Sequence, residues 1–404
     1  MTNERSSGPE LITRRLGADD RTASDVLSAE AFGSKPDPDR PWPLPGSTPY
    51  GTFERQGAAE LLVAKAVARH YDSHFHGRLV PTCGLASVTV GAEQRGRGLL
   101  RRTLLPALTE SREAGEVIAT LFPTAPGIYR PFGFEVINTQ TRLEFPSAEL
   151  AEVAAPDAEL VQVRRAGVED AAAIADCYAR WATQQNGPLS RRGASFPDGP
   201  EAMVREATGV WLAVEQGVVT GFCSWHRGTA YGPDAVATVD DLVAATPGAE
   251  AALINVLGSF RAVLGKVSLR SSGTDATQWH RRGAPGSPGW TTAYMLAVLD
   301  VPGAFAMLAP PPSLSGSWSV TVRGRTGVDI TGDYRVTADA GRCEVVPGEA
   351  GGPVFTPGGL AAWWSGAAGP AELRLGGALS GTDAYDADLA ALIGIRPVRV
   401  LDHF

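Results

Sequence analysis

One segment, Ala86–Arg102, combines residue types that could bind a phosphate, and it reads ASVTVGAEQRGRGLLRR. The β-branched run before Gly91 predicts a strand, and the apolar pattern after Gly98 predicts a helix. Glycines between the two would let a ligand approach the backbone closely, and a helix N-terminus offers unpaired N–H groups at the positive end of its dipole. The neighbouring arginines add permanent cations. This pattern predicts a pyrophosphate-binding loop.

The spacing of the glycines argues against two common classes of nucleotide-binding protein. The loop has neither the Gly-x-x-x-x-Gly-Lys-[Ser/Thr] pattern of nucleoside triphosphatases nor the Gly-x-Gly-x-x-Gly pattern of dinucleotide-binding dehydrogenases. The alternative is an ordinary strand–helix connection with surface arginines.

Bulk properties set wide limits on the fold. With 404 residues, 44% hydrophobic and 20% charged, the chain predicts a globular protein of two or three domains. The net charge of −8 argues against general nucleic-acid binding. No membrane span or secretory signal is expected, and the four dispersed cysteines predict neither disulfides nor a zinc site. We therefore expect a cytoplasmic protein without a membrane span.

The elements around the loop show an internal repeat. LITRRLGADD at Leu11–Asp20 is echoed by VQVRRAGVED at Val161–Asp170, about 150 residues later, and each predicts a strand, a turn and an amphipathic helix. Further strands are expected at Glu60–His70, Gly84–Val90, Val210–Glu215 and Val218–His226, and helices at Leu99–Ala114 and Glu250–Leu264. Beyond Leu299 we expect strands at Trp318–Arg323, Val328–Ile330, Tyr334–Thr337 and Cys343–Val346, a helix at Thr356–Ser365, an element at Ala371–Leu375 and a last helix near Tyr385–Gly394.

The loop Arg95–Gly98 resembles the acetyl-CoA loop of GNAT acetyltransferases. The position after it that is usually small is Leu100 here, and in this the loop resembles the Eis (enhanced intracellular survival) family. This resemblance implies an α/β (α+β) fold with two tandem GNAT-like mixed-sheet domains, residues 1–150 and 151–298, and a sterol-carrier-protein-like domain, residues 299–404. It implies acetyl-CoA as cosubstrate and no metal. The implied coenzyme contacts are Val88, Thr89, Val90, Arg95, Gly96, Arg97, Gly98, Leu99, Leu100, Arg101, Thr124 and Ala125.

A second motif, PGIYRPFGF at Pro126–Phe134, resembles the Gly-Ile-Tyr segment of the Eis family. That resemblance assigns Tyr129 as general acid, and a phenol with an ordinary pKa of about 10 is protonated at neutral pH. The resemblance also assigns the carboxylate of Phe404 as base. Phe32, Ser34 and His403 are the expected substrate contacts. Ser34 stands where some members carry an acidic residue, which weakens the expectation of a polycationic substrate.

The implied reaction is direct acetyl transfer to a primary amine, either of an aminoglycoside, which would make this an antibiotic-resistance enzyme, or of a lysine side chain. The resemblance also implies a homohexamer built as two trimers. In the second repeat, Ala244–Glu250 has no arginine, so that unit is expected to lack acetyl-CoA. A non-catalytic acetyl-CoA- or lipid-binding regulator is the alternative.

Three further features of the sequence stand out: a group of histidines, a pair of tryptophans and a proline within a predicted helix. His70, His74 and His76 could bind a metal, with His74 and His76 on one strand face, but ordinary surface or hydrogen-bonded histidines are favoured. Trp363 and Trp364 could line a lipid pocket, although core packing is favoured. Pro106 is expected to bend the helix that follows the loop.

Overall fold

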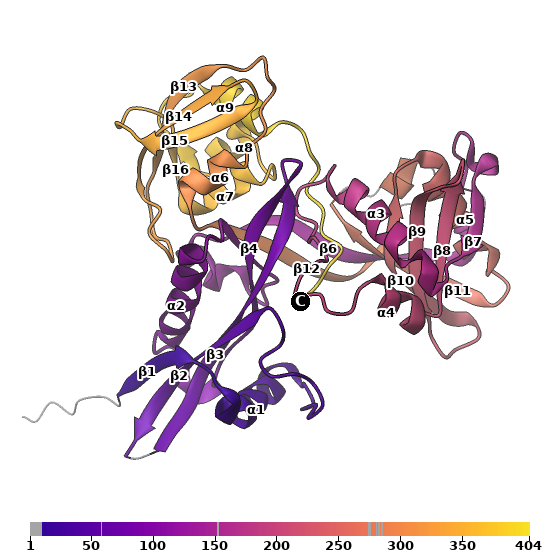
Figure 1. The fold of residues 1–404 in the computed structure, drawn as a ribbon, viewed down its shortest axis with the longest axis horizontal. Helices are drawn as coiled ribbons and strands as arrows, with labels where there is room; N and C mark the ends of the chain where they lie inside the picture. The colour runs from indigo at the N-terminus through magenta and orange to yellow at the C-terminus, as the bar shows by residue number, and fades with distance from the viewer. Residues whose placement is uncertain are drawn as a thin grey trace, which may run out of the picture.

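The computed structural model describes residues 10–57, 59–151, 153–273, 276–279, 281, 283 and 286–404. Figure 1 shows three lobes: β1–β4 with α1 and α2, β7–β11 with α3–α5, and a third lobe that contains β13–β16 with α6–α9. The C-terminus lies at the centre, where the lobes meet (Figure 1). The fold is mixed α/β with two sheets, as expected from the sequence.

The first repeat forms a long antiparallel meander followed by a crossover helix. Its elements are β1 (Leu11–Arg15), α1 (Arg21–Phe32), β2 (Ser47–Gln56), β3 (Ala59–Phe75), β4 (Arg78–Val90), α2 (Leu99–Glu113), β5 (Ile118–Leu121) and β6 (Glu135–Pro146). Helix α2 buries Leu104, Ala107 and Leu108 in a core with strands β3–β5, which holds the N-terminus of α2 next to the end of β4. The helix continues through Pro106.

The second repeat has the same order of elements, apart from an additional helix, α4, between α3 and β8. Its elements are β7 (Gln162–Arg165), α3 (Ala171–Ala182), α4 (Pro200–Glu206), β8 (Gly209–Glu215), β9 (Val218–Arg227), β10 (Gly232–Ala244), α5 (Pro247–Ser259), β11 (Leu264–Ser272) and β12 (Ser287–Val298). Strands β8 and β9 are joined by the two-residue turn Gln216–Gly217, and both residues have positive φ, as a type I′ hairpin turn requires.

The two repeats share one sheet of 12 strands and exchange their last strands. The order is β1-β2-β3-β4-β5-β12-β6-β11-β10-β9-β8-β7, so β12 pairs with β5 and β6 pairs with β11. Each repeat is thus completed by a strand from the other. The domain boundaries at residues 150 and 298 stay a prediction. Dividing the chain at these residues would leave each half of the sheet without one of its strands.

The third lobe has a five-stranded sheet, with order β15-β14-β13-β16-β17 and helices packed against it. Its elements are α6 (Val301–Ala306), β13 (Gly316–Val322), β14 (Gly332–Asp339), β15 (Arg342–Pro347), β16 (Val354–Phe355), α7 (Pro357–Trp364), α8 (Pro370–Leu375), β17 (Leu379–Ser380) and α9 (Asp386–Ile393). Trp363 and Trp364 are fully buried, and their indole N–H groups donate to backbone carbonyls, so core packing is confirmed.

Three details of the sequence prediction are wrong. Val328–Ile330 is not a strand, because Gly327 and Gly332 flank a loop there. The helix expected at Glu250–Leu264 begins at Pro247 and ends at Ser259, since Leu264 already starts β11. His76 lies beyond the end of β3 with φ of 54°, so it does not share a strand face with His74.

The end of the chain runs between the two repeats and is held along its backbone. Carbonyl oxygens of Val400 and Asp402 accept hydrogen bonds from Gln140 Nε2 on β6, at 3.0 and 3.1 Å. The Leu401 carbonyl accepts one from Arg270 Nη1 at 2.6 Å, and the Val400 N–H donates to Ser272 Oγ at 2.9 Å. The terminal residues are therefore part of the folded structure.

Candidate active site

The loop between β4 and α2 borders an open cavity of about 570 Å³, here called the loop cavity. Gly96 and Gly98 have φ of 78° and 73°, in the left-handed region that favours glycine. A Cβ atom added at either position would meet nothing within 4 Å, so the backbone here is accessible to a ligand. No side chain caps α2 at Gly98, so its first backbone N–H groups can serve a bound anion.

Strand β4 offers an unpaired edge beside the loop cavity. It pairs with β5 only from Thr82 to Leu85, and it continues alone on that side to Val90. Ser87 has φ of 50°, next to a register shift against β3, which marks the point where β4 leaves β5. Val88, Thr89 and Val90 line the loop cavity, so an extended ligand could pair with this edge.

The three arginines of the loop are not equivalent. Arg95 lines the loop cavity with Gly96, Gly98, Leu99 and Leu100. Arg97 instead donates to Glu54 Oε2 at 2.6 Å and to Gln94. The Arg101 guanidinium lies 5.7 Å from the centre of the Phe132 ring and donates to the Thr326 carbonyl at 3.4 Å. The structure therefore brings Arg95 to the cavity, and it directs the side chains of Arg97 and Arg101 to protein partners.

Tyr129 sits between two short 3₁₀ turns, Pro126–Ile128 and Arg130–Phe132. Its N–H donates to the Pro126 carbonyl at 3.1 Å, and its carbonyl accepts from Phe132 at 2.9 Å, which fixes the direction of the side chain. The ring packs edge-on against Phe134 and is 5% exposed. Burial raises the pKa of Tyr129 to about 12, so the hydroxyl keeps its proton at neutral pH.

A second cavity of about 600 Å³, here called the central cavity, adjoins the loop cavity. Both cavities are lined by Phe32, Val88, Thr124 and Tyr129. The central cavity also brings in Ser34, His403 and Phe404, which come from two distant parts of the chain. Phe32 is the last residue of α1 and is 48% exposed at this position. Ala125 precedes the first 3₁₀ turn, next to Thr124.

The last two residues are fixed in the central cavity by aromatic contacts. The Phe404 ring lies 5.5 Å from Tyr71 and 5.4 Å from Phe122, both edge-on. The His403 ring lies tilted against the Phe122 ring, with 4.4 Å between the ring centres. Burial lowers the pKa of His403, so its imidazole is neutral at physiological pH.

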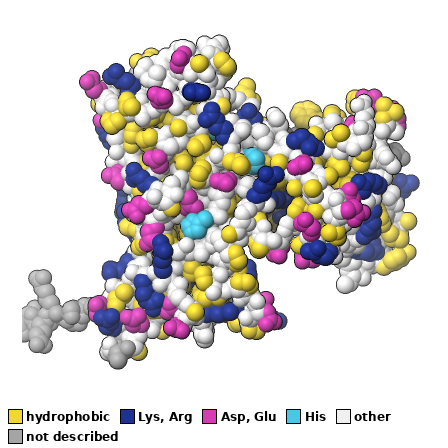
Figure 2. Space-filling view, viewed as in Figure 1, with side chains coloured by type: hydrophobic (Ala, Val, Ile, Leu, Met, Phe, Trp, Pro, Cys, Tyr) yellow, Lys and Arg dark blue, Asp and Glu magenta, His cyan; other side chains and the backbone are white. Residues whose placement is uncertain are grey.

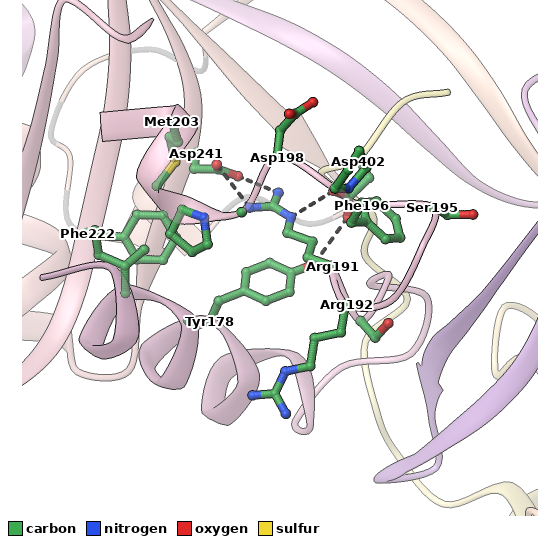
Figure 3. Close-up of a pocket in the computed structure, with 16 residues that line it drawn as sticks. Tyr178, Arg191, Arg192, Ser195, Phe196, Asp198, Met203, Phe222, Asp241 and Asp402 are labelled. Carbon is green, nitrogen blue, oxygen red and sulfur yellow. Dashed lines mark hydrogen bonds and ion pairs between the residues drawn. The ribbon is translucent and has the colours of Figure 1, made fainter. Parts of the chain in front are cut away.

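Asp402 anchors this end of the chain to the second repeat, as Figure 3 shows. Its carboxylate accepts from Arg191 Nε at 2.7 Å and lies 3.1 Å from the Tyr178 hydroxyl. Arg191 also donates to both oxygens of Asp241, at 2.7 and 3.1 Å. The Asp241 and Asp402 side chains are only 8% and 13% exposed, so these ion pairs are poorly screened. They surround a cavity of about 360 Å³ in the second repeat (Figure 3).

The second repeat lacks the features of the first loop. Only Ala245 and Thr246 separate β10 from α5, and Thr246 caps the helix by accepting from the Ala249 N–H. A Cβ on Gly248 would meet the Pro156 carbonyl at 3.3 Å, so chain packs over this helix end. The covered helix end and the absence of arginines in this segment both argue against a phosphate site here.

Several residues at the central cavity could not be found from the sequence. Trp290, Thr291 and Thr292 come from β12, the exchanged strand, and Phe122 and Pro123 follow β5. No motif marks them, because their position depends on which strand pairs with β5.

The four cysteines are all buried, and burial raises the pKa of Cys177 and Cys343 to about 11. A cysteine thiolate nucleophile is therefore not available at neutral pH.

Within the described residues, no group of three or more His, Cys, Asp or Glu side chains is placed to hold a metal ion. His70 hydrogen-bonds to Thr48 and Glu116. The described helices include none with the length and apolar character needed to span a membrane.

Comparison with known proteins places this geometry in a family. The model of the acetyltransferase (GNAT) domain matches residues 13–137. An uncharacterized N-acetyltransferase of Streptomyces avermitilis is 30% identical over 323 residues, which cover 74% of each chain. The chain belongs to the GNAT N-acetyltransferase family. It is therefore an acyltransferase, and acetyl-CoA is the cosubstrate that this fold implies.

Solved structures share the whole fold of this GNAT protein. A GCN5-related N-acetyltransferase from Kribbella flavida superposes with a TM-score of 0.80 and 24% identity, covering 98% of this chain and 99% of that one. Eis1 from Mycobacterium abscessus gives a TM-score of 0.73 and 17% identity, covering 98% and 100%. These likenesses extend over all three lobes.

Proposed function

We propose that this protein is an Eis-like N-acetyltransferase that transfers the acetyl group of acetyl-CoA directly to a primary amine. The observation that carries the proposal is the junction of two cavities at Tyr129, one along the β4–α2 loop and one that contains Phe404. The resemblance to Eis suggests an aminoglycoside or a lysine side chain as acceptor, and a homohexamer as assembly. Native mass measurement tests the assembly.

The loop cavity fits the coenzyme. The free edge of Val88–Val90 can pair with the amide groups of an extended pantetheine chain, and Gly96 with the N-terminus of α2 can receive the pyrophosphate. Arg95 adds a cation there, and Leu99, Leu100, Thr124 and Ala125 complete the proposed contacts. Arg97 and Arg101 act in this proposal through the position of the loop, or after releasing their present partners.

Acetyl-CoA would supply an acetyl group activated as a thioester. In the proposed reaction, the neutral amine attacks the thioester carbonyl, the new C–N bond forms and the C–S bond breaks. Tyr129 donates its proton to the leaving sulfur, and the carboxylate of Phe404 accepts the proton of the amine. Phe32, Ser34 and His403 surround the acceptor. With its pKa raised to about 12, Tyr129 is fully protonated when it is needed.

The test compares coenzyme A release by three proteins. These are the native form, Tyr129→Phe, and a form with one alanine added after Phe404. We expect both changes to lower turnover at least about a hundredfold while acetyl-CoA affinity is kept. Tyr334→Phe is the matched control, because the Tyr334 hydroxyl also lies in a partly buried site but in the third lobe. Turnover near the native value in both altered forms would refute the assigned roles. Acetyl-CoA binding without transfer to any amine would instead indicate a regulator.

A further inference from the structure

The central cavity opens into a third one of about 370 Å³, here called the cationic cavity. The two share Ser34, Ala86, Ser87, His403 and Phe404. The rest of the cationic cavity is lined by α1, by the segment from Lys35 to Pro49 and by β3. In the proposed reaction acetyl-CoA fills the loop cavity, on the other side of Tyr129. An acceptor with its amine near Tyr129 would therefore extend into the cationic cavity.

The lining of the cationic cavity is unbalanced in charge. Five cationic side chains face it, against the two carboxylates of Asp25 and Asp37, and the cations are Arg21, Lys35, Arg40, Lys65 and Arg69. The excess is three positive charges, or two if the proposed carboxylate of Phe404 is counted. The lining of the central cavity, by comparison, contains no Lys, Arg, Asp or Glu side chain. On the face shown in Figure 2, by comparison, Lys and Arg are interspersed with Asp and Glu.

The two innermost cations, Lys65 and Arg69, are held by neutral groups. Lys65 Nζ donates to the carbonyl and the hydroxyl of Ser24, at 2.8 and 2.9 Å, and to the hydroxyl of Ser28. Arg69 donates to the Ser195 carbonyl at 2.8 Å, and its guanidinium lies 5.6 Å from the centre of the Phe404 ring. Within the described residues, neither cation has a carboxylate at ion-pair distance.

The carboxylates of the cavity are already engaged elsewhere. Asp25 lies 3.8 Å from Arg21, one helical turn earlier on α1. Asp37 accepts the N–H of Asp39 within its own loop. Lys65 is 3% exposed, and burial lowers the pKa of Lys65 to about 8, while burial also lowers the pKa of Arg69. Asp25 acts on Lys65, and Asp402 on Arg69, only from beyond ion-pair distance. Burying these two cations therefore remains costly, and a bound anion would offset that cost.

We propose that the acceptor is a small molecule that carries an anionic group, a carboxylate or a phosphate, in addition to the amine that is acetylated. The anionic group binds Arg69 and replaces a serine hydroxyl as a hydrogen-bond partner of Lys65 in the cationic cavity, and the amine lies in the central cavity near Tyr129. This inference rests on the acetyl transfer proposed above. It makes polycationic aminoglycosides poor acceptors, because their remaining ammonium groups would face these cations.

The test uses amines of one length that differ only in the group at the far end. The probes are 6-aminohexanoate, 6-aminohexyl phosphate, 6-aminohexanamide and 1,6-diaminohexane, with kcat/KM measured from coenzyme A release. We expect the two anionic probes to exceed the amide by about tenfold or more, and the diamine to be the poorest despite its two amines. Comparing carboxylate with phosphate then shows which anion the cavity prefers.

Two substitutions connect the preference to its residues. Lys65→Met and Arg69→Gln remove one cation each and keep most of the side-chain length. We expect each to reduce the ratio of kcat/KM for 6-aminohexanoate over 6-aminohexanamide about tenfold. Arg261→Gln is the matched control, because Arg261 is exposed in the second repeat and should leave the ratio unchanged. A ratio that stays at the native value in both cavity variants would overturn the assignment to these residues.

Calorimetric binding of the same probes separates this inference from the transfer reaction. Equal or better kcat/KM for the amide or the diamine would overturn the anionic acceptor and leave the acetyltransferase intact. Tighter binding of the anionic probes without acetylation would support the anion site and count against the proposed reaction. Absence of any preference in binding and in turnover would refute the inference outright.

Discussion

Replacing Asp402 by alanine should undock the end of the chain without unfolding the protein. The substitution removes the hydrogen bonds of the Asp402 carboxylate with Arg191 at 2.7 Å and with the Tyr178 hydroxyl at 3.1 Å. Arg191 keeps its two hydrogen bonds to Asp241, so no buried charge is left without a partner. Both hydrogen bonds are made to the ionised carboxylate, and the one from Tyr178 is weakened because its proton is shared with the Leu189 carbonyl at 2.8 Å. Together they contribute about 3 kcal/mol.

That loss is comparable to the whole docking free energy of the last three residues. Burial of the Phe404 ring contributes about 2 kcal/mol, and the His403 ring contact and the Gln140 hydrogen bond about 1 kcal/mol each. With the contribution of Asp402 the favourable total is about 7 kcal/mol. Ordering three residues costs about 5 kcal/mol, so the docked state is favoured by about 2 kcal/mol. Removing about 3 kcal/mol makes the undocked state the favoured one by about 1 kcal/mol, so about one molecule in six stays docked.

The expected result is a kcat about sixfold lower in Asp402→Ala, with unchanged acetyl-CoA affinity, because the last three residues do not line the loop cavity. Carboxypeptidase sensitivity provides a direct measure of undocking. The control is Asp386→Ala, which removes a comparable pair with Arg374, at 2.7 and 2.8 Å, inside the third lobe. Native kcat in a variant whose terminus has become sensitive to carboxypeptidase would refute a catalytic role for Phe404.

Three further predictions concern the coenzyme loop and the pH dependence. Gly98→Ala places a Cβ at a φ of 73° and should weaken acetyl-CoA binding by about 1–2 kcal/mol, measured by calorimetry; unchanged affinity would argue against the loop as the binding site. Burial raises the pKa of Tyr129 to about 12, so kcat/KM should rise with pH as the amine loses its proton and show no falling limb due to Tyr129 below about pH 11. A falling limb near pH 9 that is abolished in Tyr129→Phe would contradict this. Burial lowers the pKa of Lys65 to about 8, so Lys65 loses its charge as the pH rises through that value. The preference for anionic acceptors should therefore weaken between pH 7 and 9. In Lys65→Met this preference should stay constant over the same pH range.

The sequence predicted the parts of the site that depend on local structure. The strand, loop and helix around Gly96 are continuous in the chain, and glycine and apolar periodicity mark them directly, whereas Tyr129 was assigned only through the resemblance of its motif. The sequence also predicted the two repeats, because each has its own strand, turn and helix signals. These signals report local backbone geometry, which neighbouring residues determine.

The remaining parts depend on contacts between distant segments. The exchange of β6 and β12 leaves the hydrophobic pattern of both strands unchanged, so Trp290 could not be assigned to the first repeat's cavity. The position of Lys65 facing Ser24 and Ser28 requires α1 to cross β3 at one place. A lysine inside a Val- and Ala-rich strand was a visible anomaly, and it is the signal that could have revealed the cationic cavity.

Strand exchange also affects how the chain is made. Strand β5 ends at Leu121, whereas its neighbour β12 starts at Ser287, so a ribosome adding about 5–20 residues per second separates the two by on the order of ten seconds. During that interval the newborn chain has an open sheet edge at β5, where another nascent chain could pair. Chains released before β12 is synthesised would keep that edge, so early termination should yield aggregates rather than a small active fragment.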